Sequence, residues 1–357
     1  MSAGERRLAG SCSTSISGPP PWYHISASIP LVSKDETCMS HDLYLPARSY
    51  CPKNCLYGAP YVAAGYVGLP DLRDPRLRGE WAHGWHPPTH NIHPELVIGS
   101  TGKSRLRRHF RHFWVARQDQ VDYLSAHGYL HVRAIGLPVV YLPPRKVSRE
   151  RDSLLVMPVH SLDTTQHNWN FERYAEEIAK LRGRFSRIVI CVHTSCAKKG
   201  YWVRAFEERG FPIVFGADVG DRNSLLRMKA LFSQFEFVTS NGFGSHLAYA
   251  AYFGAKPSVY GELPLYQEDD FKNDRLYRSC PDLVQVVLGL MRRESIKSVG
   301  AWLFSEPDAA KEALAWGAFQ VGHDHKVSPR ELQMIFAADV RARLWFGRRF
   351  GLSGDDR

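Results

Sequence analysis

Apolar and polar residues alternate along the second half of the chain in blocks that predict strands and helices in turn. Helical periodicity and helix-ending glycines predict helices over residues 171–181, 201–209, 224–232 and 245–253. Short apolar runs of strand length lie before, between and after them, at residues 154–160, 187–193, 212–215, 235–239 and 256–260. Strands and helices that alternate at about 25-residue spacing are typical of parallel βαβ units, whose sheet is covered on both faces. The pattern therefore predicts an α/β fold with a doubly wound parallel sheet in this half.

The first half of the chain has a weaker pattern. Residues 55–142 are rich in Gly, Pro, His and Trp and are expected to be irregular, apart from strands over 113–116 and 131–135 and a helix over 118–127. The charge-rich segment 143–153 marks a domain boundary. We therefore expect four parts, which are a flexible extension over 1–40, an N-terminal domain over 41–145, a nucleotide-binding Rossmann-like domain over 151–280 and a helical region over 281–357. In the last part, Ser328 and Glu331 form a predicted capping box.

Composition and charge narrow the class of protein. The 357 residues are 44% hydrophobic and 23% charged, which is typical of a soluble globular protein and excludes a collagen or a disordered tail. The net charge of +10 favours an anionic partner. The longest charge-free stretch of suitable length, Phe237 to Ala255, is too polar to span a membrane, and no secretory signal is present, so a cytoplasmic protein is expected. The seven cysteines are expected to be reduced, with a zinc site at Cys51 and Cys55 as the alternative.

The turn from 239 to 246 has the residue types of a phosphate site. It leaves a predicted strand and opens a predicted helix, where glycines and free N–H groups favour a phosphate. The expected donor-binding residues in it are Ser240, Asn241, Gly244, Ser245 and His246. An ordinary capped turn is the alternative. A dinucleotide fingerprint is disfavoured, because Leu247 stands where its third glycine is required.

Two other predicted strands end in polar turns. His160 follows the first strand of the domain, and Thr194 lies in the His-Thr-Ser turn that begins at His193. Because ligands bind at the carboxyl ends of parallel strands, His160 and Thr194 are also expected to bind the donor. The alternative for such a histidine is a structural hydrogen bond.

In the first half, His83 precedes Gly84 after a short apolar strand candidate and is a candidate general base, because its ordinary pKa lies near neutral pH. His83, His86, His90 and His93 also allow a metal interpretation, which Pro87 and Pro88 oppose because they interrupt a continuous helix.

The run KSRLRRHFR from Lys103 to Arg111 is strongly basic. We expect it to meet an anionic acceptor or a membrane surface, through Arg107 and Arg108 together with Arg117 further along. Specific nucleic-acid binding and a plain solvated face are the alternatives.

The motifs together resemble a known family. In the first half the motifs are HGW, then WVAR, DQVDYLSAHG and IGLPVVYLP, and in the second half they are LLVMPVHS, RIVICVHTS and VTSNGFGSHLAYAAYFGAKPSVYGE. They are similar to motifs of two-domain (GT-B) glycosyltransferases of bacterial capsule and lipopolysaccharide synthesis. The resemblance covers residues 80 to 262 or so. It implies two Rossmann-like domains, with the donor nucleotide held by the VTSNGFGSHLAYAAYFGAKPSVYGE segment.

By this resemblance, Ser240, Asn241, Gly244 and Ser245 would meet the donor phosphates, and His83 would deprotonate the acceptor hydroxyl. Ala250 stands where retaining members carry a glutamate, and Glu262 lies beyond the next strand, where it is expected to contact a ribose or sugar hydroxyl. The departure at Ala250 favours an inverting enzyme. The resemblance implies no catalytic metal or other cofactor, and the sequence has no convincing Asp-x-Asp motif. The donor would be a nucleotide sugar: CMP-activated acidic sugars suit the basic charge, and UDP and GDP donors stay open.

The acceptor would be a glycan or glycolipid met at the inner face of the membrane. The terminal RLWFGRRFG segment would dock there as an interfacial helix, and a core helix with a solvated basic end is the equal alternative. Two other classes stay open. One is a non-catalytic or degenerate homologue that binds a nucleotide or polysaccharide, and the other is an NAD(P)-dependent oxidoreductase or epimerase.

Overall fold

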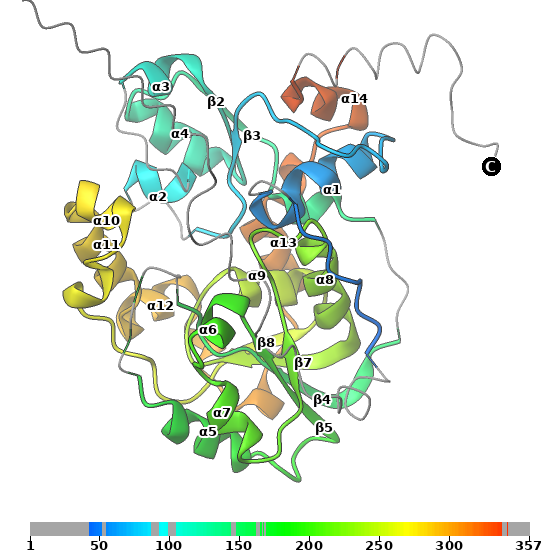
Figure 1. Ribbon diagram of the computed structural model, residues 1–357, viewed down its shortest axis with the longest axis vertical. Helices are drawn as coiled ribbons and strands as arrows, with labels where there is room; N and C mark the ends of the chain where they lie inside the picture. Colours follow the sequence, from blue (N-terminus) through cyan, green and yellow to red (C-terminus); the bar gives the residue numbers. More distant parts are fainter. Residues whose placement is uncertain are drawn as a thin grey trace, which may run out of the picture. The chain divides into compact units, whose positions relative to one another are not determined.

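The computed structural model describes residues 43–51, 55–86, 93–98, 105–143, 148–161, 165, 167, 169–337 and 341. These residues belong to one compact unit that begins at Leu43. They form an α/β structure with two parallel sheets (Figure 1). The predicted extension over 1–40 and the RLWFGRRFG segment lie outside the described residues.

The larger sheet confirms the pattern predicted for the second half of the chain. Its strands run parallel in the order β6-β5-β4-β7-β8, with bounds β4 Glu150–Val156, β5 Arg187–Val192, β6 Ile213–Phe215, β7 Phe235–Ser240 and β8 Lys256–Val259. The helices between them are α5 Phe171–Ala179, α6 Thr194–Lys198, α7 Val203–Glu207, α8 Ser224–Gln234 and α9 Ser245–Tyr252. Of these, the short α6 was not predicted.

Side chains that alternate along the strands bury both faces of this sheet. Leu154 and Ile190 point into the hydrophobic cluster under α5 and α7, whereas Leu155 and Val189 point into a second cluster that includes residues of α8 and α9. Successive side chains of a strand lie on opposite faces, so a sheet covered by helices on both faces needs strands that are apolar throughout. The continuous apolar runs seen in the sequence have this cause.

The smaller sheet lies in the first half of the chain. Its strands run parallel in the order β1-β2-β3, with bounds β1 Glu80–Trp81, β2 His112–Val115 and β3 His131–Ala134. The strands β2 and β3 and the helix α4, Gln118–Ala126, match the predicted elements within a residue or two. The short helices α2, Pro94–Ile98, and α3, Arg105–Phe110, precede β2.

The expectation of irregular structure was wrong for the helix α1, Ala59–Tyr66. Pro60 occupies its first turn, and the N-cap residue Gly58 adopts a left-handed conformation that a glycine tolerates. Small residues and an internal glycine, Gly65, obscure the helical pattern in the sequence, because the buried side chains are mostly alanines.

The C-terminal region is helical where it is described, and it contacts both sheets. Its elements are η5 Glu268–Phe271, α10 Arg275–Ser279, α11 Asp282–Leu290, α12 Arg293–Gly300, η6 Ala301–Leu303, η7 Pro307–Ala309, α13 Leu314–Val321, η8 His323–His325, α14 Pro329–Leu332 and η9 Gln333–Ile335. The predicted capping box at Ser328 is confirmed, because its Oγ accepts a hydrogen bond from the backbone N–H of Glu331. Beyond it, Arg78 N–H donates to the carbonyl of Ile335, which ties the segment after α14 to the segment just before β1.

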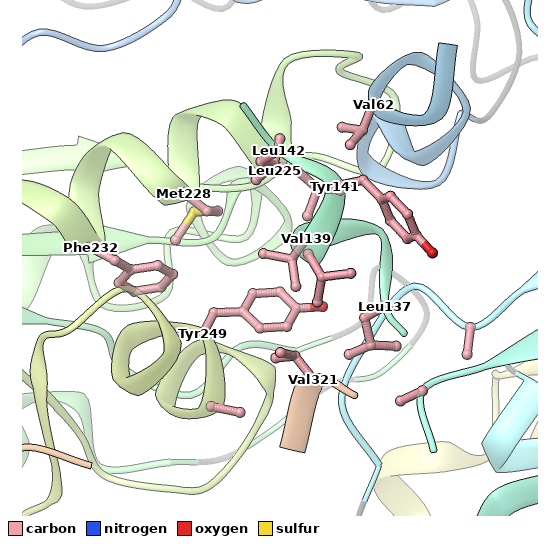
Figure 2. Packing of buried hydrophobic residues seen from close by; sticks show 14 of the residues in the cluster. Val62, Leu137, Val139, Tyr141, Leu142, Leu225, Met228, Phe232, Tyr249 and Val321 are labelled. Carbon is pink, nitrogen blue, oxygen red and sulfur yellow. The ribbon is translucent and has the colours of Figure 1, made fainter. Parts of the chain in front are cut away.

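The two sheets share a hydrophobic core. One cluster of buried side chains contains Phe113 of β2 as well as Leu155 of β4, and it continues through α8, α9 and α13. Figure 2 shows part of it: Val139, from the 3-10 helix η4 (Pro138–Tyr141), lies close to Tyr249 of α9, and Leu142 lies beside Leu225 of α8. The predicted boundary segment 143–153 follows η4, and its last four residues form the start of β4. The hydrophobic cluster contains residues on both sides of this segment, such as Leu142 and Leu155.

Candidate functional site

A cavity of about 1230 Å³ lies at the carboxyl ends of strands from both sheets. Residues 157–161 after β4, His193 after β5 and residues 243–246 after β7 line it from the larger sheet. Residues 83–86 after β1 line it from the smaller sheet. Its volume is slightly above the upper end of the usual range for small-molecule sites, about 300–1000 Å³.

The strand order explains why a cavity forms there. From β4 the chain builds β5 and β6 on one side of the sheet and then crosses to β7 and β8 on the other side. The connections after β4 and β7 therefore leave in opposite directions, and a crevice opens between them. Ligands of open α/β sheets bind at this type of position.

The wall contributed by α2 and the C-terminal helices is mostly apolar. Its apolar side chains include Leu96, Leu276, Val286, Val287, Leu290, Met291, Ile296 and Val299, and Tyr277, Gln285, Ser295 and Ser298 add polar groups. Leu96 also packs against the cluster formed by η5, α10 and α11, so α2 and the C-terminal helices close the same side of the cavity. One wall of the cavity is thus suited to an apolar part of a ligand.

The polar part of the lining is rich in histidine. Six histidines face the cavity: His83, His86, His160, His167, His193 and His246. No Asp, Glu, Lys or Arg side chain is among the described residues of the lining. Burial is the main cause that lowers the pKa of each of the six, and it lowers those of His86 and His246 to about 3. These imidazoles are therefore neutral near pH 7 and are able to accept a proton.

His160 and His193 form a stacked pair across β4 and β5. Their ring centroids are 4.5 Å apart with an interplanar angle of 22°. Ser195 fixes the ring of His193, since its backbone N and its Oγ lie 3.2 Å and 2.6 Å from His193 Nδ1. The Ser195 hydroxyl in turn lies 2.6 Å from the carbonyl oxygen of Ser161. The pair is positioned by the turns after both strands.

The glycines of the turn before α9 have packing roles. A Cβ on Gly242 would collide with Val159 Cγ1, and a Cβ on Gly244 would lie 3.2 Å from the ring of His246. Gly244 has an extended φ of 179° and precedes Ser245, the first residue of α9. The sequence pattern Gly242-x-Gly244 thus allows close contact between the loops after β4 and β7, and it leaves the start of α9 facing the cavity.

Hydrogen bonds join the smaller sheet to the start of α9. Ser245 Oγ accepts a hydrogen bond of 2.8 Å from the backbone N of Trp85, and the Tyr249 hydroxyl donates to the carbonyl of His83 at 3.0 Å. A Cβ on Gly84 would come within 3.0 Å of Ser245 Oγ. His83, the candidate base, is therefore held next to the start of α9 by bonds that its neighbours in the chain make.

The structure brings five of the nine predicted catalytic and donor-binding residues to the cavity lining: His83, His160, Gly244, Ser245 and His246. The other four do not line it. Asn241 is buried and accepts a hydrogen bond from Val159 N, and buried Ser240 accepts one from Gly242 N. Thr194 Oγ1 donates to the carbonyl of Ala217. Asn241, Ser240 and Thr194 thus hold the loops in place.

Glu262 is half exposed on the α5 side of the sheet. Its carboxylate forms an ion pair with Arg173 at 3.1 Å, and its backbone N–H donates to Glu177. Glu262 is not among the residues that line the cavity.

Two of the three arginines expected to bind an acceptor, Arg108 and Arg117, are not among the described residues of the cavity lining. Arg117 is buried, paired with Asp119 at 2.9 Å, and donates to the carbonyl of Gln320. The guanidinium of Arg108 lies 5.3 Å from the centre of the Tyr129 ring. Arg107 belongs to α3, but its side chain lies outside the described part of the structure.

Tyr57 is a cavity residue that sequence reasoning missed. Its ring lies 5.5 Å from that of His83 and 6.4 Å from that of His193, so it lies between histidines of the two sheets. Leu56 and Tyr57 both have positive φ, 48° and 61°, which is uncommon for residues other than glycine. Such backbone strain concentrates at functional sites. No residue type in the segment signals it, since leucine and tyrosine rarely adopt this conformation.

A metal centre finds no support in the described residues, where no three His, Cys, Asp or Glu side chains are arranged to hold an ion. His90 lies outside these residues, so the four-histidine cluster is not tested as a whole. Cys51 and Cys55 are free thiols, and burial and the neighbouring Cys51 raise the pKa of Cys55 to about 12.

Neither a protein-family model nor a curated protein matches this sequence. Within the described part of the chain, no helix has both the length and the apolar character needed to cross a membrane.

Proposed function

We propose that the protein is a glycosyltransferase with a two-domain GT-B arrangement. It moves a sugar from a nucleotide-activated donor to a surface-polysaccharide or glycolipid acceptor, with inversion and without a metal. The observation that carries this proposal is the cavity itself. It lies at the switch point of a parallel sheet, where nucleotides bind in α/β folds, and a second parallel sheet closes it with a neutral histidine.

The residues divide into two groups in this proposal. Gly244, Ser245 and His246 at the start of α9, with His160 opposite, bind the donor phosphates, because backbone N–H groups at a helix start favour an anion. His83 faces them from the smaller sheet and removes the proton of the acceptor hydroxyl. Its lowered pKa keeps the imidazole neutral, as a base requires. The net charge of +10 supports an acceptor at the inner membrane face and a cytoplasmic location.

A thermal-shift screen against CMP, CDP, UDP, GDP and NAD tests the donor class. A nucleotide at 100 times its Kd adds about 2.7 kcal/mol to the free energy of unfolding. We expect one nucleoside phosphate to stabilise the protein and Ser245→Ala to weaken its binding. A response to NAD alone would refute the transferase in favour of an oxidoreductase.

A second candidate, a homologue that binds nucleotide or polysaccharide without turnover, is favoured by the uncharged lining. In the described residues the cavity wall has no cation to stabilise a departing phosphate. The variant His83→Ala separates the two candidates. If the protein is a transferase, this variant binds the nucleotide but loses donor turnover by about 100-fold or more, whereas exposed His131→Ala keeps it. If wild-type protein binds donor but shows no turnover with any acceptor preparation, the non-catalytic candidate holds.

A further inference from the structure

Three histidines lie at the carboxyl ends of three neighbouring strands. His193 follows β5, His160 follows β4 and His246 follows β7 by a short turn, and these strands are adjacent in the sheet. All three residues line the cavity. They therefore span the switch point from one side to the other, with the stacked pair His160–His193 on one side and His246 at the start of α9 on the other.

Two of these rings have an unsatisfied nitrogen. His193 Nε2 and His246 Nε2 are buried and have no hydrogen-bond partner among the described residues. A buried polar atom without a partner costs about 1–3 kcal/mol. Native proteins seldom keep such atoms unless a ligand, ion or water meets them. Both nitrogens belong to residues of the cavity wall but have almost no accessible surface, so a small turn of the rings towards the cavity would let a ligand with acceptor oxygens satisfy them.

Among the described residues, the charged groups near this cluster do not line the cavity themselves. Lys198 of α6 is near enough to His193 to disfavour its protonation, and Lys199 Nζ donates to Ser161 Oγ at 3.2 Å. Asp270 lies 3.1 Å from His167 Nδ1. The other titratable groups of the described lining are Tyr57, Cys191, Tyr249, Tyr266, Tyr277 and the remaining histidines. Burial raises the pKa of Cys191 to about 12, so its thiol stays neutral.

We propose, on the basis of the glycosyltransferase function above, that His160, His193 and His246 form the phosphate site of the donor and take up a proton when the anion binds. Without a ligand, desolvation in the cavity keeps the three imidazoles neutral, and His160 also lowers the pKa of both His193 and His246 by like-charge repulsion. A bound phosphate reverses this effect, because a nearby negative charge favours the imidazolium form. A site without a fixed cation thus acquires its positive charge together with its ligand.

This coupling fixes how affinity depends on pH. If one proton is taken up, the affinity rises about tenfold for each pH unit by which the pH is lowered. The probes are UDP-glucose, GDP-mannose and a CMP-linked sugar, whose phosphate diesters keep the same charge between pH 6 and 7. Sulfate is a fourth probe, a fixed dianion without nucleoside or sugar.

Isothermal titration calorimetry at pH 6.0 and 7.0, in two buffers of different ionisation enthalpy, measures the affinity and the protons bound. We expect about one proton taken up and close to tenfold tighter binding at pH 6.0. His193→Asn and His246→Asn should each lose most of the proton uptake, and exposed His131→Asn should keep it. The wild-type proton count needs no variant, so a variant that misfolds does not remove the test.

The outcomes separate the phosphate site from the proposed function. A nucleotide sugar that binds without proton uptake, or with uptake unchanged in both variants, overturns the histidine site and leaves the transferase standing. Sulfate that binds with proton uptake while no nucleotide sugar binds supports the histidine site and overturns the transferase. Binding of none of the four probes overturns both.

Discussion

Replacing Gly317 in α13 by alanine adds one methyl group, which should disturb the packing of α13 on α9 and, through α9, the candidate site. A Cβ on this residue would lie 2.7 Å from the carbonyl carbon of Ala251 and 2.8 Å from Cα of Tyr252, both in α9. Ordinary van der Waals contacts are 3.4–4 Å, so α13 and α9 would have to separate by about 1 Å. The atoms in the way are backbone, which cannot rotate aside. Overpacking of this kind costs about 1–3 kcal/mol.

The assay for Gly317→Ala is urea unfolding followed by tryptophan fluorescence, with the thermal-shift response to nucleotide as a second readout. The matched control is Gly65→Ala in α1, where an added Cβ meets nothing within 4 Å. The control should be neutral or more stable by up to about 1 kcal/mol, because alanine is the better helix former. We expect Gly317→Ala to lose about 1–3 kcal/mol and to bind nucleotide more weakly, since the start of α9 belongs to the cavity. Equal stability of the two variants would refute the close packing of α13 on α9.

Two further predictions concern stability. Burial lowers the pKa of His86 and His246 to about 3 in the folded protein, whereas unfolded histidine titrates near 6.5. The contribution of these two residues to the free energy of unfolding is therefore complete above pH 6.5 and falls as the pH is lowered towards 3. This contribution falls by about 1.4 kcal/mol per pH unit for each histidine, or roughly 3 kcal/mol for both by pH 5.5. Urea unfolding at pH 5.5, 6.5 and 7.5 measures the free energy of unfolding. No decrease at pH 5.5 would contradict the burial of these rings. Asn241→Ala should cost about 1–3 kcal/mol, because the buried N–H of Val159 loses its acceptor, while Asn223→Ala, which loses only a more exposed bond to a carbonyl, should cost less than about 1 kcal/mol. Similar losses in the two asparagine variants would argue against the loop-bracing role of Asn241.

The shared core bears on how the site works. One hydrophobic cluster joins β2 to β4 and continues through α8, α9 and α13, so the two sheets meet through a shared core. The bond from Trp85 N to Ser245 Oγ and the bond from Tyr249 to the carbonyl of His83 add polar links beside the cavity. The geometry of the histidines therefore comes from fixed packing, which favours a preformed site.

The sequence was informative where structure depends on local pattern. The strands of the larger sheet are apolar on both faces, and their continuous apolar runs alone located β4 to β8 within a few residues. Helix ends at Gly128, Gly210 and Gly254 were also predictable, since each has the positive φ for which glycine is favoured. The parallel α/β class follows from these local signals, as does the expectation of ligands at the strand ends.

Tertiary structure decided which of the polar residues at those strand ends reach the cavity. Ser240, Asn241 and Thr194 have the same residue types as a phosphate site, but their hydrogen bonds are made with neighbouring loops. Tyr57 reaches the cavity because its backbone has a positive φ, and no residue type in the segment predicts this conformation. Periodicity reports which face of an element is buried, whereas the partner of a side chain depends on how segments far apart in the chain meet. The strand order, the return of α13 to α9 and the six-histidine lining are of this second kind, so they could be known only from the folded chain.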